Sequence, residues 1–191
     1  MIRPFSALLI CALALSSCGS QARGPYGTTG EQQRDIARAE ESYRESLAED
    51  DDENRERLLR ATLGFDLYHG QAHNNLGVLL LQQGRLYDAA EEFEWARKLL
   101  PGHPEPRANL ALTLERGGKH ADAVEAALSA IEVRPGHLGA IKLIAMVSID
   151  EGLVDPLIDE HLDAIATRAP EPEWREWAVE QRLRRESSLN R

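Results

Sequence analysis

The sequence predicts an all-α protein, and its composition, its turn signals and its length support that prediction. Hydrophobic residues make up 42% of the chain but aromatic residues only 5%. Alanine and leucine therefore supply much of the apolar content, as in packed helices. Runs of β-branched residues and Asn-Gly dipeptides, which are typical of β-hairpins, are missing from the sequence. The length of 191 residues suits one folded domain.

An internal repeat with a period of 34 residues organises most of the chain. Apolar, small, glycine and proline positions each recur at this spacing, which is typical of a solenoid of stacked units. Each unit is expected to be a helical hairpin, because glycine favours the turn between two helices and Pro-Gly ends the second one. The recurring sets are Leu76, Leu110 and Ile144; Gly77, Ala111 and Ala145; Gly84, Gly118 and Gly152; Ala89 and Ala123; Ala96, Ala130 and Ala164; and Pro101 and Pro135.

These residue types resemble the tetratricopeptide (TPR) motif, a 34-residue helix–turn–helix with the signature W-x2-L-G-x2-Y…A-x3-F…P. Residues 70–103 match it best and depart from it at His73 and Leu80. The matching residues are Leu76, Gly77, Ala89, Phe93, Ala96 and Pro101. The resemblance implies a right-handed solenoid of about three to four helical hairpins with a C-terminal capping helix.

The repeats weaken toward both ends of the chain, as capping units do. A degenerate hairpin is expected at residues 31–69, TPR-like repeats at 70–171 and the capping helix at 172–191. In the last repeat Ala164 keeps the pattern, whereas Leu157 replaces a small residue of the second helix. One face of the capping helix is expected to carry Trp174, Trp177, Ala178 and Gln181.

The residue types in the best-matching repeat have physical roles that do not depend on the family. Small side chains at Gly77, Ala89 and Ala96 allow the two helices of a hairpin to approach closely, and Phe93 fills the remaining space. Glu92 is expected to be a surface residue whose replacement costs under about 0.5 kcal/mol.

An acidic run at residues 49–53 separates the two helices expected in the N-terminal hairpin. The run lacks the alternating ligand spacing of an EF-hand loop, which disfavours calcium binding. Its composition favours an exposed turn whose aspartates cap the following helix.

Residues 1–17 have the layout of a secretory signal peptide. Arg3 supplies a minimal positive segment, and residues 5–15 form an apolar stretch shorter than the roughly 20 residues of a spanning helix. The stretch ends in Leu-Ser-Ser-Cys, which resembles the bacterial lipobox and implies lipidation of Cys18. An ordinary signal peptide with a coincidental cysteine is the alternative. The glycine-rich residues 18–30 are expected to form a flexible tether behind the lipidated cysteine.

A formal net charge of −10 limits the possible partners. An acidic body repels the phosphates of nucleic acid and the anionic surface of a membrane, so neither is expected to bind it directly. Membrane attachment would therefore depend on a lipid anchor with more than one acyl chain, because a single chain holds a protein only marginally.

The sequence contains no evident catalytic constellation, so the chain is expected not to be an enzyme. Gly-x-Ser-x-Gly and P-loop motifs are missing. His69 and His73 span a loop-to-helix junction, while His103 and His137 lie one repeat apart, or roughly 10 Å. Two ligands of one zinc ion lie closer than that. No metal, no other cofactor and no small-molecule substrate is therefore predicted.

The TPR resemblance also implies a binding surface, because in this family the first helix of each repeat lines a concave groove that contacts peptides. The carboxylate clamp of some members is not matched, since Asn74, Val78 and Glu105 occupy the corresponding positions. A hydrophobic strip is predicted instead, and the sequence leaves open whether that strip is exposed or buried. The implied groove residues are Asn74, Val78, Leu81 and Gln82; Ala108, Leu112, Glu115 and Arg116; and Lys142, Met146, Ile149 and Asp150.

The anchor and the repeats together predict a non-catalytic adaptor that faces the periplasm and binds other envelope proteins or peptides. The chain resembles the small TPR lipoproteins of pilus and secretion assembly, which implies help in assembling or localising such a complex. Ser20 does not resemble the aspartate that retains lipoproteins in the inner membrane, so the outer membrane is favoured. The alternatives are an adaptor that docks peptidoglycan hydrolases and, more remotely, a hydrolase on a helical scaffold.

Overall fold

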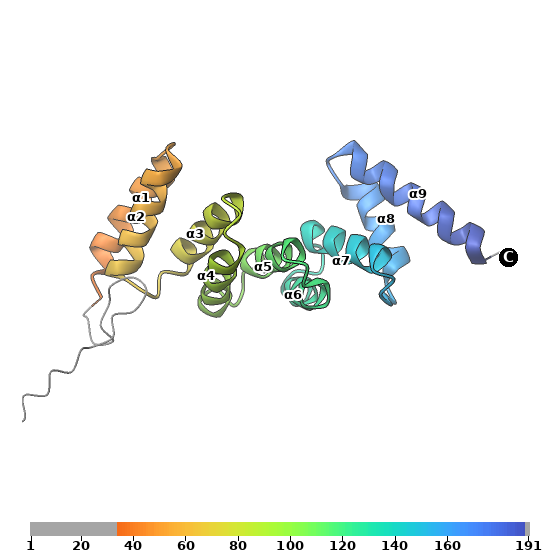
Figure 1. Ribbon diagram of the computed structural model, residues 1–191, viewed down its shortest axis with the longest axis horizontal. Coiled ribbons are helices and arrows are strands. Elements are labelled where there is room, and N and C mark those ends of the chain that lie inside the picture. Colours follow the sequence, from red (N-terminus) through yellow and green to blue (C-terminus); the bar gives the residue numbers. More distant parts are fainter. Residues whose placement is uncertain (1–33, 190–191) are drawn as a thin grey trace, which may run out of the picture.

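The computed structural model describes residues 34–189, which form helices and turns without a strand (Figure 1). The helices are α1 (Ile36–Ala48), α2 (Asp52–Phe65), α3 (Gly70–Gln82), α4 (Leu86–Leu99), α5 (Glu105–Arg116), α6 (His120–Val133), α7 (Leu138–Asp150), α8 (Ile158–Arg168) and α9 (Pro172–Leu189). The first eight pair into four hairpins, in each of which we term the first helix A and the second helix B. The predicted all-α solenoid of helical hairpins is confirmed.

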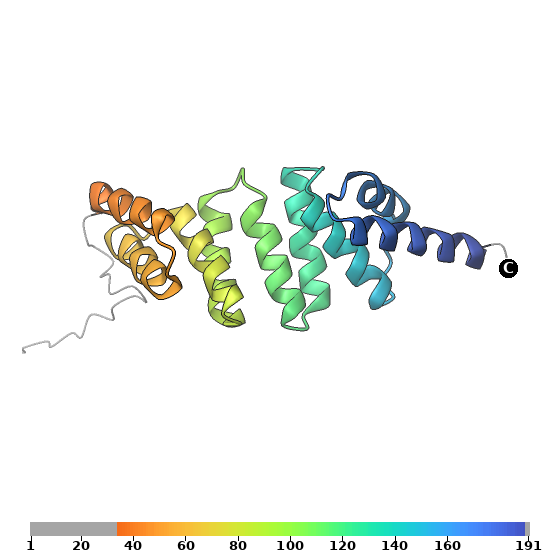
Figure 2. The ribbon, with the colours of Figure 1, turned by 90° about the horizontal axis from the view of Figure 1, so that it is seen from above.

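The hairpins follow one another along a single axis, so that α1 and α9 lie at opposite ends (Figures 1 and 2). Each helix B packs against helix A of its own hairpin and against the next helix in the chain. Apolar surface is therefore buried both within each hairpin and between neighbouring hairpins, in three successive core clusters.

A glycine in the left-handed backbone region forms the turn inside each of the last three hairpins. The φ angles are 75° at Gly84, 72° at Gly118 and 65° at Gly152. A residue with a side chain adopts such angles at a higher conformational free energy than glycine does. Next to Gly84, the backbone N–H of Arg85 donates to the carbonyl of Leu80 at 2.9 Å and closes the end of α3. The predicted turn glycines are confirmed.

A small residue facing a large one sets the close packing of the α3–α4 hairpin. Phe93 is fully buried, and a Cβ atom added to Gly77 would lie 2.7 Å from a ring carbon of Phe93. The ring therefore occupies the space that any side chain at position 77 would need. The equivalent pairs are Ala111 with Ala127 and Ala145 with Leu162, each within one core cluster.

The prediction that Glu92 is a surface residue is wrong. Glu92 is only 7% exposed and lies between α3 and α4, where its carboxyl group contacts His73. The physical reason is helix geometry: Glu92 follows Ala89 by three residues and precedes Ala96 by four, so it shares their core-facing side.

The last repeat is displaced by one residue from the 34-residue alignment. Ile158 and Ile165 hold the buried positions of α8, whereas Leu157 is exposed and Ala164 is half-buried. The connection from α7 to α8, residues 151–157, is longer than the equivalent turns, so α8 begins later in the chain. The predicted alignment of Leu157 and Ala164 with the small core residues is therefore wrong.

The acidic run forms the α1–α2 turn and the start of α2. The side chain of Asp51 accepts a hydrogen bond from the backbone N–H of Asn54 at 2.9 Å, which caps α2 as the sequence predicts. Arg55 donates to the carbonyl of Glu49 at 2.8 Å and holds the turn against the helix.

The C-terminal helix packs through the face that the sequence predicts. Ala178 and Gln181 of α9 are buried, and Trp174 and Trp177 are half-buried with their rings edge to face at 5.3 Å. These side chains cover the last core cluster.

Within residues 34–189, no helix combines the length and the apolar character needed to cross a membrane. The predicted signal peptide, the lipidated Cys18 and the tether at 18–30 lie outside the described residues.

Replacing Phe93 with alanine should lower the free energy of unfolding by about 3–5 kcal/mol, because it leaves a cavity against Gly77. Urea denaturation of the two proteins measures this difference. Glu91→Ala, an exposed change two residues away on the same helix, is the control and should cost less than about 0.5 kcal/mol. Equal unfolding midpoints for the two variants would contradict the proposed hairpin packing.

Candidate functional site

Helices α3, α5 and α7 line the concave face of the solenoid, where the predicted groove residues lie. α5 packs against both α3 and α7, whereas neighbouring helices B make no comparable contact with one another. Helices A are therefore closer together than helices B, and the row of hairpins bends toward them (Figure 1).

A row of hydrogen-bonded side chains crosses this face from α1 to α5. Asn75 donates to the hydroxyl of Tyr43 at 3.1 Å. Asn74 donates to Asn75 at 3.3 Å, and Asn109 donates to Asn74 at 3.1 Å. Each carboxamide has two N–H donors and two acceptor positions, so the row holds the side chains in place and leaves some capacity for a ligand.

Asn74 is among the groove residues predicted from the sequence, whereas Tyr43, Asn75 and Asn109 are not. A signal was present, since Asn75 and Asn109 are 34 residues apart and so occupy the same repeat position. The TPR signature does not include that position, so the signature alone does not identify these two asparagines.

The predicted groove residues differ in exposure. Leu81 is only 6% exposed and belongs to the first core cluster, so the buried alternative holds for this residue and a ligand cannot reach it. Half-buried side chains are those of Asn74, Val78, Ala108, Leu112, Glu115, Lys142, Met146 and Ile149, and exposed ones are those of Gln82, Arg116 and Asp150.

Four apolar side chains stay partly exposed while they pack against the core. Val78 and Leu112 pack on the first cluster, Met146 on the second and Ile149 on the third. These residues come from α3, α5 and α7, so a ligand lying across the three helices would find apolar contacts on each of them.

Lys142 is engaged within the protein. Its ammonium group forms an ion pair with Glu171 and lies 5.1 Å from the ring centre of Trp174. The hydrogen bond from Lys142 holds the pKa of the Glu171 carboxyl below its ordinary value. This cation therefore links α7 to the start of α9.

A hollow of about 290 Å³ opens at the N-terminal end of the concave face, between α3 and the α1–α2 hairpin. The groove residues Val78 and Gln82 and the carboxamide of Asn75 line it. Glu49, Asp50 and Arg55 line the opposite side, so that side carries two carboxylates and one guanidinium group. The hollow adds room for a ligand side chain at this end of the groove.

A buried His73–Glu92 pair joins α3 to α4. Nδ1 of His73 lies 2.6 Å from Oε2 of Glu92, Nε2 lies 2.8 Å from the carbonyl oxygen of Leu67, and Trp95 stacks on the ring. Because a carbonyl oxygen can only accept, Nε2 carries a proton. Nδ1 of a neutral imidazole is then an acceptor, so the carboxyl group of Glu92 donates the shared proton.

Burial raises the pKa of Glu92 to about 7 and lowers the pKa of His73 to about 4. Removal from water disfavours the charged form of each group, so both shifts favour the neutral pair. Both ring nitrogens of His73 are engaged in hydrogen bonds, which gives this histidine a structural role.

Two other histidines cap helices. Nδ1 of His69 accepts from the backbone N–H of Ala72 at 3.1 Å, and Nδ1 of His137 accepts from Ala140 at 3.1 Å. The two positions are two repeats apart and have the same role at the starts of α3 and α7. Residues 34–189 contain no group of three or more side chains suited to holding a metal ion.

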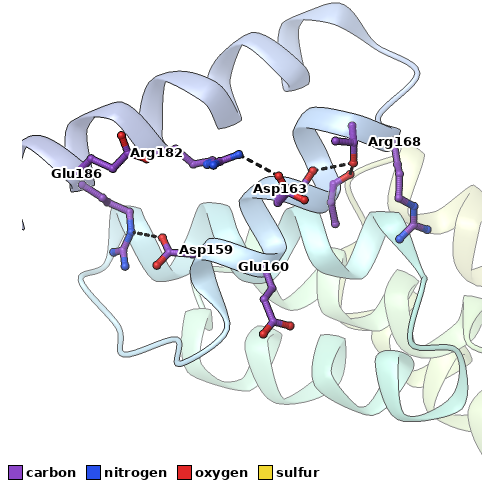
Figure 3. Close-up of a pocket in the computed structure, with 9 residues that line it drawn as sticks. Asp159, Glu160, Asp163, Arg168, Arg182 and Glu186 are labelled. Atoms are coloured by element: carbon purple, nitrogen blue, oxygen red, sulfur yellow. Dashed lines mark hydrogen bonds and ion pairs between the residues drawn. The ribbon is translucent and has the colours of Figure 1, made fainter.

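A polar hollow of about 670 Å³ lies between α8 and α9 (Figure 3). Arg182 pairs with Asp163 at 2.9 Å and Arg185 pairs with Asp159 at 3.0 Å, so its charges largely compensate one another. The hydroxyl of Thr167, which also lines the hollow, donates to the carbonyl of Asp163. The arrangement holds α9 on α8 and provides no nucleophile with an adjacent base.

Comparison with known proteins supports the TPR-like fold. No protein-family model matches the chain, and no curated protein matches its sequence. Among solved structures, MamA is 18% identical, with a TM-score of 0.59 over 80% of this chain and 83% of the other. YrrB, described as a TPR protein with an unusual peptide-binding site, is 17% identical, with a TM-score of 0.63 over 76% of each chain.

A third structure, the first TPR domain of Spaghetti bound to an HSP90 peptide, is 11% identical, with a TM-score of 0.59. It covers 62% of this chain and 97% of the other. At these identities the likeness is one of fold, and it places the chain among TPR-like helical solenoids.

The neutral His73–Glu92 pair predicts that Glu92→Gln makes folding stability sensitive to acid. Between pH 4.5 and 6.5, the ordinary pKa values of the two groups, the unfolded chain holds one proton on His73 and the folded pair holds one on Glu92. The folded and unfolded states then bind the same number of protons, so the contribution of the pair to folding stability does not change with pH in this range.

In the Glu92→Gln variant the amide can still donate to Nδ1, but His73 titrates alone. The pKa of His73 is lower in the folded protein than in the unfolded chain, so the unfolded chain binds a proton first as the pH falls. Folding stability that is present above pH 6.5 is therefore lost as the pH falls toward 4. Urea unfolding should show the variant losing about 1–2 kcal/mol more than the wild type between about pH 7 and about pH 5. The same pH dependence in both proteins would contradict the neutral pair.

Proposed function

We propose that the chain is a non-catalytic adaptor of the bacterial envelope, anchored by lipid at Cys18, that binds a segment of another protein along the concave face of α3, α5 and α7. The observation that carries the binding proposal is the hydrogen-bonded row of Asn74, Asn75 and Asn109 beside partly exposed apolar side chains.

A carboxamide row suits the backbone of an extended peptide. Each peptide unit presents one N–H donor and one C=O acceptor, and an asparagine side chain can satisfy both. Because Asn74 and Asn109 come from adjacent helices A and are bonded at 3.1 Å, they are already ordered before a ligand arrives. Preordered side chains lose less conformational entropy on binding. Two proteins with this fold are described as binding peptides or having a peptide-binding site, which agrees with the proposal.

The side chains around the row indicate which ligand sequence would fit. Val78, Leu112 and Met146 favour apolar ligand residues, which gain free energy as they leave water. At the N-terminal hollow, the two carboxylates of Glu49 and Asp50 outnumber the single guanidinium group of Arg55, which favours a basic ligand residue. The ligand we propose is therefore an extended segment with apolar residues and a positive charge at one end.

The lipobox-like sequence at residues 15–18 supports a location in the envelope, facing the periplasm. Ser20, in place of an aspartate, favours the outer membrane over the inner one. The resemblance to small TPR lipoproteins supports a role in pilus or secretion assembly. Capture of the full chain from crosslinked cells distinguishes this role from its rival. Pilus or secretin subunits among the captured proteins would support it, and peptidoglycan hydrolases would favour the docking alternative.

Replacing Asn74 and Asn109 together with alanine should weaken peptide binding by about tenfold or more, since each hydrogen bond contributes about 0.5–1.5 kcal/mol. The probe is a set of random-sequence peptides, displayed on phage and selected on the full chain, with affinity measured by fluorescence anisotropy. Asn54→Ala, an exposed asparagine on α2, is the matched control and should leave affinity unchanged. Unchanged affinity in the double variant, with an intact melting curve, would place the peptide site elsewhere.

Cys18→Ala should abolish incorporation of labelled fatty acid and move the protein out of the detergent phase in a Triton X-114 partition. The reason is that thioether attachment requires the thiol of that residue. Cys11→Ala is the matched control, because this cysteine lies within the expected signal peptide and should not affect lipidation. Labelling that persists in the Cys18 variant would disprove the anchor.

A further inference from the structure

A hollow of about 420 Å³ lies where the end of α7, the α7–α8 connection, the start of α8 and α9 meet. Its walls are mostly aliphatic, and those of the connection face water, since Val154 is 94% exposed and Leu153 40% exposed. Ile149 of α7 and Ile158 of α8 complete the apolar lining. Both the volume and the apolar walls are typical of ligand sites, which have roughly 300–1,000 Å³.

Two buried polar side chains line the hollow without a partner in the protein. Ser148 of α7 is 4% exposed and Gln181 of α9 is 9% exposed. Neither side chain forms a hydrogen bond with another residue of 34–189, and neither is sealed completely from solvent. Because buried polar groups are normally paired, a hydroxyl and a carboxamide left free beside an open space point to a ligand.

The corresponding positions of other repeats hold apolar or internally bonded side chains. Ser148 falls at the repeat position of Leu80 and Leu114. Gln181 falls at the repeat position of Thr113, whose hydroxyl donates to a backbone carbonyl of its own helix at 2.8 Å. Serine is smaller than leucine, so the last hairpin has both free space and an unused polar group at this position.

The connection that borders the hollow, residues 151–157, is held in place by hydrogen bonds. The backbone N–H of Leu153 donates to the carbonyl of Ser148 at 2.8 Å. The carboxylate of Asp155 lies 2.8 Å from Nδ1 of His161 and is buried with it. The hollow is therefore formed before a ligand arrives, which lowers the entropic cost of binding.

The charged groups of the hollow favour a ligand without net charge. Asp155 and Arg185 are the charged residues among those that line it, and they carry opposite charges. Asp155 pairs with His161, and Nε of Arg185 pairs with Asp159 at 3.0 Å. The terminal nitrogens of Arg185 make no hydrogen bond within residues 34–189, so they can donate to a carbonyl oxygen.

We propose that this hollow binds a short apolar segment of another polypeptide chain. One aliphatic side chain of the segment packs against the walls and gains free energy as it leaves water. The adjoining peptide groups pair with Gln181 and Ser148, since a carboxamide and a hydroxyl each both donate and accept. The site lies at the C-terminal end of the solenoid and does not depend on the row through Asn74 and Asn109.

Titration of the full chain with N-acetyl-leucine methylamide, followed by NMR spectroscopy, tests the proposal. The carboxamide resonances of Gln181 and the methyl resonances of Val154 and Ile158 should shift together with one dissociation constant. N-acetyl-glycine methylamide has the same peptide groups without the aliphatic side chain, and it should bind about tenfold or more weakly.

Three results of this titration would overturn the proposal. The first is equal binding of the leucine and glycine compounds, or shifts spread over the whole surface. The second is tighter binding of N-acetyl-leucine with a free carboxylate, which would mark an anion site at Arg185. The third is a shift of the same resonances with protein concentration alone, which would place a second copy of the chain in the hollow.

Replacing Ser148 with alanine and Gln181 with methionine removes both polar groups and nearly keeps their volume. The variant should bind the leucine compound about tenfold or more weakly, because the peptide groups lose their partners. Its melting temperature should stay or rise, since neither group is paired within the protein. Unchanged binding in this variant would contradict the proposal.

A rim substitution keeps the test independent of folding. Val154→Asp changes a fully accessible side chain and should weaken binding of the leucine compound without lowering the melting temperature. Leu128→Asp, at a 46% exposed position of α6 outside the hollow, is the control and should not weaken binding. The Asn74/Asn109 double variant should still shift the Gln181 resonances, so failure of the groove and failure of this site are distinguishable. Equal binding by the Val154 and Leu128 variants would place the apolar contact elsewhere and overturn the proposal.

Discussion

The close approach of helices A and B within a hairpin is the contact on which the rest of the solenoid depends. Between α3 and α4 it rests on Gly77 and Phe93, where the ring fills the space that a side chain at position 77 would occupy. The same contact recurs with other residue sizes in the next two hairpins. Because each hairpin stacks on its neighbour, a change in one spacing would alter the position of every later helix A, and with it the geometry of the concave face.

The groove and the core are formed by the same helices, so neighbouring residues of one helix can differ in whether a ligand reaches them. Leu81 is buried in the core, while Val78, one turn earlier in α3, stays partly exposed to a ligand. The His73–Glu92 pair adds a polar contact to the same hairpin without opening it to water, because burial favours the neutral form of both groups and each has a hydrogen-bond partner inside the hairpin. The row through Asn74 then joins adjacent hairpins across the concave surface.

Much of the fold could be predicted from the sequence, because a 34-residue period places the turn glycines and the small residues directly. The errors have physical causes. From the sequence alone, a glutamate at position 92 is expected on the surface, because a buried polar residue needs a hydrogen-bond partner. The structure supplies that partner, His73. The α7–α8 connection lengthens and shifts the last repeat by one residue, which a fixed period cannot represent. For the candidate site, the sequence indicated α3, α5 and α7, which line the concave face, but it could not separate the buried Leu81 from the partly exposed Val78, because exposure depends on how neighbouring hairpins stack.

Hydrogen–deuterium exchange of the full chain, with and without a selected peptide, tests the central claim that helices A form the binding face. Exchange should become slower on peptide binding in α3, α5 and α7, where the ligand would restrict local opening, and should stay unchanged in the C-terminal half of α9. Protection confined to the helices B α4 and α6, with no change in α3 and α5, would contradict the account.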